Sequence, residues 1–167
     1  MKWYAVFGLL SLLLVLTGCP QVTKNSMDEG SYDAPAWLAG KWWSIDANGK
    51  RNDGYYLEKD TKKGNIKCYE LDSTGKIKYV DARQVILSTV GNKVFLSFYN
   101  SGDDMSEEGY YIYEFRKVSN TEVVLAGVKE HKIGYDAGAE EILTYLEKNK
   151  DNKDLYDASE TTRYKKE

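Results

Sequence analysis

Short stretches of alternating apolar and polar residues, separated by turn-forming residues, cover most of the chain between residues 40 and 128. In 93–99, for example, Val94, Leu96 and Phe98 fall on one face, as in a half-buried strand. Asp, Ser, Asn and Gly between such stretches favour turns, because Asp and Ser bond their own backbone and Gly adopts positive φ. The pattern predicts an antiparallel meander. The expected strands are one from Gly40, then 54–59, 65–71, 76–81 and 84–90 (two strands or one bent strand), 93–99, 110–118 and 122–128.

The pattern changes after residue 128. Apolar residues at 142, 143 and 146 have helical spacing and predict a helix over 139–148. Its acidic first turn and basic last turn complement the helix dipole. The later segment 161–164 is expected to return and pair beside the first strand. A meander of this length needs closure or a second sheet, because its edges and its apolar face must be covered.

The segment Gly40-Lys41-Trp42 resembles the first-strand signature of lipocalins and related calycin barrels. The resemblance implies a mainly β fold: an antiparallel up-and-down barrel of about eight strands over 37–167, with one C-terminal helix packed outside. It also implies that Trp42 plugs the closed end and that a late Arg covers it. Arg163 is the first candidate for that Arg, and Arg116 is the alternative.

The N-terminus has the features of a secretory signal. Lys2 precedes an apolar run, 6–16, which is shorter than the roughly 20 residues that a spanning helix needs. Leu16-Thr17-Gly18-Cys19 then resembles the lipobox of bacterial lipoproteins. The resemblance implies that 1–18 is a cleaved signal peptide and that Cys19 carries lipid, which anchors the protein to a membrane of the bacterial envelope. Pro20, rather than Asp, follows Cys19, which favours the outer membrane if the source has one.

The region after the lipobox, 19–36, is polar, lacks periodicity and ends just after Pro35. We interpret it as the lipidated N-terminus and a flexible tether, and we expect the folded domain to start at residue 37.

Composition narrows the function classes. The formal charge of the whole chain is −3, and its basic residues are scattered, so no nucleic-acid partner is expected. The chain has two Cys. With Cys19 linked to lipid, Cys68 has no partner, and its place in a predicted strand favours burial.

Motifs of catalysis and of metal or cofactor binding are absent from the sequence. It has no nucleophile elbow, no phosphate-binding loop, no His-Glu-x-x-His and no Cys-x-x-Cys. His131 is the sole histidine and lies in a polar connection. The acidic stretch 103–108 lacks the ligand spacing and central Gly of an EF-hand, so a solvated loop is expected. We therefore expect neither an enzyme nor a cofactor or metal site.

Two function classes remain. In the first, the barrel is a cup that binds a small apolar or amphipathic molecule, with Tyr55 and Leu57 lining its upper interior. Tyr111 and Tyr113 join them if the intervening strand count is even; otherwise, these Tyr are simply good strand residues. In the second, the barrel is filled and the protein meets another envelope protein, as an inhibitor or immunity-type lipoprotein would. A cavity on the order of 300 Å³ or more would favour the cup.

Overall fold

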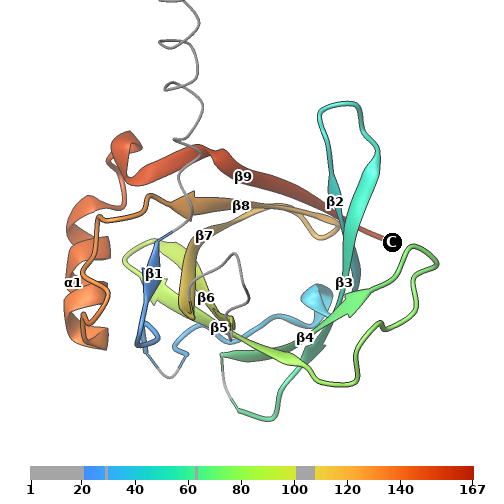
Figure 1. The fold of residues 1–167 in the computed structure, drawn as a ribbon, viewed down its shortest axis with the longest axis horizontal. Coiled ribbons are helices and arrows are strands. Elements are labelled where there is room, and N and C mark those ends of the chain that lie inside the picture. Colours follow the sequence, from blue (N-terminus) through green and yellow to red (C-terminus); the bar gives the residue numbers. More distant parts are fainter. Residues whose placement is uncertain (1–20, 29, 63, 101–107) are drawn as a thin grey trace, which may run out of the picture.

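Eight antiparallel strands form a closed barrel in the computed structural model, which describes residues 21–28, 30–62, 64–100 and 108–167. Consecutive strands pair in chain order, and the last strand pairs with both β8 and β2, which closes the ring (Figure 1). The predicted fold, a mainly β barrel with one C-terminal helix outside, is confirmed. The barrel strands are β2 (Gly40–Ile45), β3 (Arg51–Lys59), β4 (Asn65–Leu71), β5 (Arg83–Val90), β6 (Lys93–Asn100), β7 (Gly109–Ser119), β8 (Glu122–Val128) and β9 (Tyr156–Lys166).

Closure occurs between the first and last barrel strands. Trp42 lies opposite Lys166, and Ile45 lies opposite Arg163. The predicted return of 161–164 to the side of the first strand is therefore confirmed.

The predicted strand 76–81 is absent. These residues belong to a connection, 72–82, in which only an isolated bridge joins Leu71 and Ile77. The Asp72 carboxylate accepts N–H bonds from Thr74 and Lys76 and so turns the chain as β4 ends. β4 pairs with the start of β5 only through residues 65–68. The connection 72–82 therefore has no neighbouring strand to pair with among the described residues.

Helix α1 (Ala139–Asn149) packs outside the barrel wall (Figure 1). Ile142 and Leu146 are fully buried, and the short helix η2 (Lys153–Leu155) contributes Leu155 beside them. The predicted helix 139–148 is confirmed with one further residue at its end. The core under the helix contains Met27, Val90, Phe95, Ile112, Val128, Ile133, Ala137, Ile142, Leu146 and Leu155.

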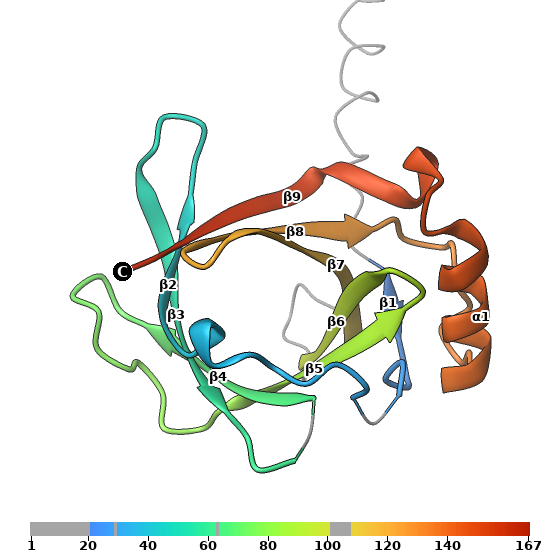
Figure 2. The same cartoon turned by 180° about the vertical axis from the view of Figure 1, so that it is seen from behind.

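The expected flexible tether is wrong for the described part of 19–36. Strand β1 (Val22–Thr23) pairs with the start of β7, and Met27 is fully buried in the core under α1. The chain then crosses one end of the barrel to the short helix η1 (Ala36–Leu38), as Figure 2 shows. Polar composition concealed this packing, because some of the buried residues, such as Gln21 and Thr23, are themselves polar and give no apolar pattern. The folded domain thus includes the described residues from Gln21 onward, which the expected start at residue 37 left out. The signal peptide 1–18 and Cys19 lie outside the described residues.

Candidate functional site

The interior of the barrel contains a cavity of about 210 Å³. Most of its lining is apolar, and polar side chains gather on part of the wall. Its lining residues come from β2, β3, β4, β5, β6, β7, β8, β9 and η1, so the whole ring of strands shapes it. The lining comprises Leu38, Trp42, Tyr55, Leu57, Ile66, Cys68, Arg83, Val85, Leu87, Leu96, Phe98, Tyr113, Phe115, Val123, Leu125, Glu160, Thr162 and Tyr164.

Trp42 forms the floor of this cavity. Its side chain is 2% exposed, and its indole N–H donates to the Leu38 carbonyl at 2.7 Å. Trp37 packs edge-on against it, with ring centroids 6.1 Å apart. Gly40 precedes the tryptophan with a φ of +125°, and a Cβ there would lie 2.9 Å from Cε of Lys166. Glycine is therefore required for the chain to turn from η1 into β2.

The cation above Trp42 is Lys166, and the expectation of Arg163 is wrong. Lys166 Nζ lies 5.9 Å from the Trp42 ring centroid and donates to the Trp37 carbonyl at 2.6 Å. Arg163 lies between two cavity-lining residues of β9, so strand alternation directs its side chain outward. There it is exposed and forms an ion pair with Glu122.

The alternative, Arg116, is also wrong. Its guanidinium pairs with Glu114 at 2.6 Å and lies 5.0 Å from the Tyr156 ring centroid, away from Trp42.

Three tyrosines supply hydroxyl groups to the cavity: Tyr55 on β3, Tyr113 on β7 and Tyr164 on β9. The Tyr55 and Tyr164 rings meet edge-on with centroids 6.0 Å apart, and Tyr113 stacks on Phe98 at 5.8 Å. Within the described part of the chain, none of the three hydroxyls has a hydrogen-bond partner.

Burial keeps these phenols neutral. It raises the pKa of Tyr55 to about 12, and the nearby Asp53 carboxylate acts in the same direction. Burial also raises the pKa of Tyr113 and of Tyr164 well above the usual range. At neutral pH all three hydroxyls can both donate and accept a hydrogen bond.

The residues expected to contact a ligand are only partly brought together. Tyr55, Leu57 and Tyr113 line the cavity, whereas Tyr111 does not. Tyr111 instead stacks on Phe98, with ring centroids 5.5 Å apart and planes 13° from parallel.

Sequence reasoning missed Tyr164 and Glu160 as lining residues. The even spacing of 160, 162 and 164, which puts all three on one face of a strand, is a signal that could have found them.

The remaining polar groups of the cavity are Cys68, Arg83 and Glu160. Burial raises the pKa of the Cys68 thiol to about 11, so it is a protonated thiol and a poor nucleophile at neutral pH. Burial also raises the pKa of Glu160, with a smaller effect from Asp157. Neither Arg83 nor Glu160 forms an ion pair with another residue of the described ranges.

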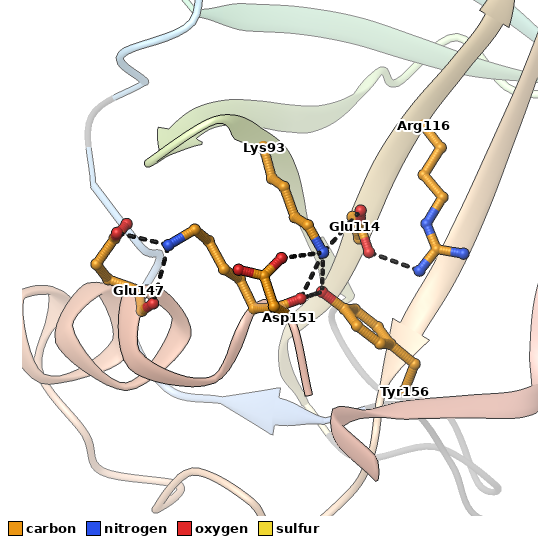
Figure 3. A network of polar contacts seen from close by, with 7 residues as sticks. Lys93, Glu114, Arg116, Glu147, Asp151 and Tyr156 are labelled. Carbon is orange, nitrogen blue, oxygen red and sulfur yellow. Dashed lines mark hydrogen bonds and ion pairs between the residues drawn. The ribbon is translucent and has the colours of Figure 1, made fainter. Parts of the chain in front are cut away.

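A second polar cluster lies outside the barrel, where α1 ends (Figure 3). Lys93 Nζ lies 3.6 Å from Glu114 Oε1 and 3.3 Å from Asp151 Oδ1, and it donates to the Lys150 carbonyl. The Tyr156 hydroxyl donates to the same carbonyl at 2.6 Å. These groups cap the helix and fasten it to the barrel wall, and each is already satisfied by another. We assign the cluster a structural role.

The other residues considered from sequence lie outside the cavity lining. His131 is exposed, with a φ of 61°, and its Nε2 lies 3.5 Å from Glu130 Oε1. Of the acidic stretch 103–108, only Glu108 is described; the rest lies outside the described residues. Within the described ranges, no three His, Cys, Asp or Glu side chains are grouped to hold a metal. No helix in those ranges has the length and apolar character to cross a membrane.

Searches for similar proteins returned little. No protein-family description and no curated protein was found to match the chain. Among solved structures, the barrel is similar to a DUF4909 family protein from Staphylococcus aureus subsp. aureus Mu50, with 10% sequence identity and a TM-score of 0.47. The match covers 80% of this chain and 100% of that chain. At this identity and score the likeness carries no argument about function.

Proposed function

We propose that the protein is a lipid-anchored lipoprotein of the bacterial envelope whose barrel binds a small apolar or amphipathic ligand. The observation that supports ligand binding is the apolar cavity lined by three tyrosines whose hydroxyls have no hydrogen-bond partner among the described residues. The lipobox supports the anchor, and Pro20 after Cys19 favours the outer membrane in a Gram-negative source. The role is binding rather than catalysis, since Cys68 is protonated and no nucleophile–base pair lines the cavity.

The cavity constrains the ligand. Typical pockets for drug-sized molecules have about 300–1,000 Å³, so about 210 Å³ fits one or two rings or a short acyl chain. The apolar part would lie on the floor against Trp42 and Leu38. A hydroxyl or carbonyl group at the other end would bond the hydroxyls of Tyr55, Tyr113 or Tyr164.

The second candidate is an envelope interaction protein with no small-molecule ligand. The same volume favours it, because a cavity below the usual range also suits a small barrel filled mainly by its own side chains.

A binding experiment separates the two candidates. We expect 1-aminonaphthalene to gain fluorescence when it enters the cavity of the Cys19→Ser protein. Tyr55→Asp places a charge in the cavity and should weaken binding by at least about tenfold, because a buried unpaired charge is costly. Tyr56→Asp is the matched control, since Tyr56 is the next residue of β3, faces outward against Tyr69 and should leave binding unchanged. Circular dichroism checks that both variants fold.

Absence of dye binding, or equal weakening by both variants, would refute the cup and leave the interaction protein. The search for a partner would then turn to pull-downs from envelope fractions.

The anchor has its own test. Wild-type protein is expected to partition into detergent and to sediment with membranes, whereas Cys19→Ser is expected to stay in the aqueous phase. Unchanged partitioning of the variant would refute lipidation at Cys19.

A further inference from the structure

Gln21, two residues after the lipobox cysteine, is held firmly against the barrel. Its side chain is 3% exposed, and its backbone N–H donates to the Val128 carbonyl at 2.6 Å. Its side-chain carbonyl accepts N–H bonds from Lys132 at 2.8 Å and from Ile133 at 2.9 Å. Two residues of extended chain reach at most about 7 Å. A lipid on Cys19 would therefore leave the barrel almost no freedom to move away from the membrane.

The place of attachment is the open end of the barrel. β7 starts at the residues that pair with β1 and ends at a turn where the Thr121 carbonyl accepts the N–H of Lys166. Lys166 lies opposite Trp42, so that turn belongs to the closed end. β1 consequently lies at the other end, as does Val128, where β8 stops.

Exposed apolar side chains gather at this same end. Strand alternation places the β2–β3, β4–β5 and β8–β9 connections there, together with the end of β6. Of the six large hydrophobic residues that are exposed within the described ranges, five belong to the β4–β5 and β8–β9 connections or to the end of β6, and one, Val118, lies at the closed end. The five are Ile77, Tyr79, Val80, Tyr99 and Tyr135. Val80 is 92% exposed, and the Lys24 N–H donates to the Tyr135 carbonyl beside the anchored segment.

We propose that the open rim of the barrel rests on the lipid surface, with the β4–β5 connection, 72–82, inserted among the headgroups. Two separate features carry this: the short link from Cys19 to Gln21, and the exposed apolar residues that gather at the open rim. Tyr79 and Tyr135 suit the membrane–water interface, because each has an apolar ring and a polar hydroxyl group that can stay hydrated. The cavity would open toward the bilayer and exchange its ligand directly with the lipid. The proposal rests on the lipid anchor of the proposed function.

Lipid quenching tests this orientation with a pair of matched variants. Val80→Trp adds an indole at the open rim, and Val118→Trp adds one at an exposed site of the closed end. Each full-length lipidated variant is reconstituted in phosphatidylethanolamine–phosphatidylglycerol vesicles with or without brominated acyl chains. The native tryptophans contribute the same background in both. We expect bromine to quench the added fluorescence of Val80→Trp by at least twofold and to leave that of Val118→Trp unchanged.

Equal quenching of the two variants, or quenching of Val118→Trp alone, would overturn the proposal. If the proteins fail to sediment with the vesicles at all, the anchor itself is refuted, so the two failures are distinguishable. A ten-residue Gly-Ser insertion between Pro20 and Gln21 gives a further readout. It should reduce the difference between the variants, because the short link imposes the orientation; an unchanged difference would overturn that part of the proposal.

Discussion

Replacement of Trp42 by Ala tests whether the indole supports the closed end of the barrel. The indole is 2% exposed and packs between the Trp37 ring and the apolar cavity wall. Truncating a large buried aromatic costs about 3–5 kcal/mol. The upper part of this range is expected, because the wall is hydrogen-bonded on all sides and cannot collapse into the space. At this chain length a loss of about 4–5 kcal/mol corresponds to a decrease in Tm of about 8–20 °C.

Two further variants divide this loss into its parts. Trp42→Phe keeps most of the ring packing but removes the 2.7 Å bond to the Leu38 carbonyl, and we expect it to cost about 1–2 kcal/mol. Trp37→Ala removes a half-buried ring and should cost less than Trp42→Ala. Urea unfolding of the Cys19→Ser protein, followed by circular dichroism, measures all three. A cost below about 1 kcal/mol for Trp42→Ala would refute a supporting role for the indole.

Two further predictions concern titration in the cavity. Folding raises the pKa of Tyr55 to about 12. The neutral phenol therefore contributes fully to stability below pH 10, and this contribution is lost as the pH rises toward 12. Tyr55→Phe should flatten the resulting decline in Tm. A decline just as steep in the variant would contradict this. Burial raises the pKa of Cys68 from 9.0 to about 11, so iodoacetamide at pH 8 should alkylate it about 100-fold more slowly in folded than in unfolded protein. Similar rates in mass spectrometry would contradict the raised pKa of Cys68.

Local patterning predicted the antiparallel meander, and the resemblance of Gly40-Lys41-Trp42 to calycin barrels supplied its closure into a barrel. Alternation such as that of Val94, Leu96 and Phe98 located the strands, apart from the absent strand 76–81. The segment that closes the sheet was correctly placed at 161–164. The identity of the cation above Trp42 was not predictable in this way, because it depends on register. Arg163 and Lys166 differ by an odd number of residues, so they point to opposite faces of β9.

The candidate site was predicted only in part, for a different reason. Whether Tyr55 or Tyr113 faces inward follows from alternation, but the cavity between them depends on how side chains from all eight strands fill the interior. The N-terminal segment was also misjudged from composition. Gln21 and Thr23 are buried because their polar groups find partners in distant parts of the chain, which no local pattern reveals.

The closure of the barrel by β9 has a consequence for how the chain folds. β9 follows every other strand in sequence, yet it pairs with β2 and β8 on its two sides. Until it arrives, both of those strands keep an unpaired edge, and such edges recruit strands from other molecules. Contacts between residues as distant as Trp43 and Glu167 also form slowly, because a long loop must close first. A chain that crosses a membrane unfolded and N-terminus first would therefore be most prone to aggregation in the interval before its final strand emerges.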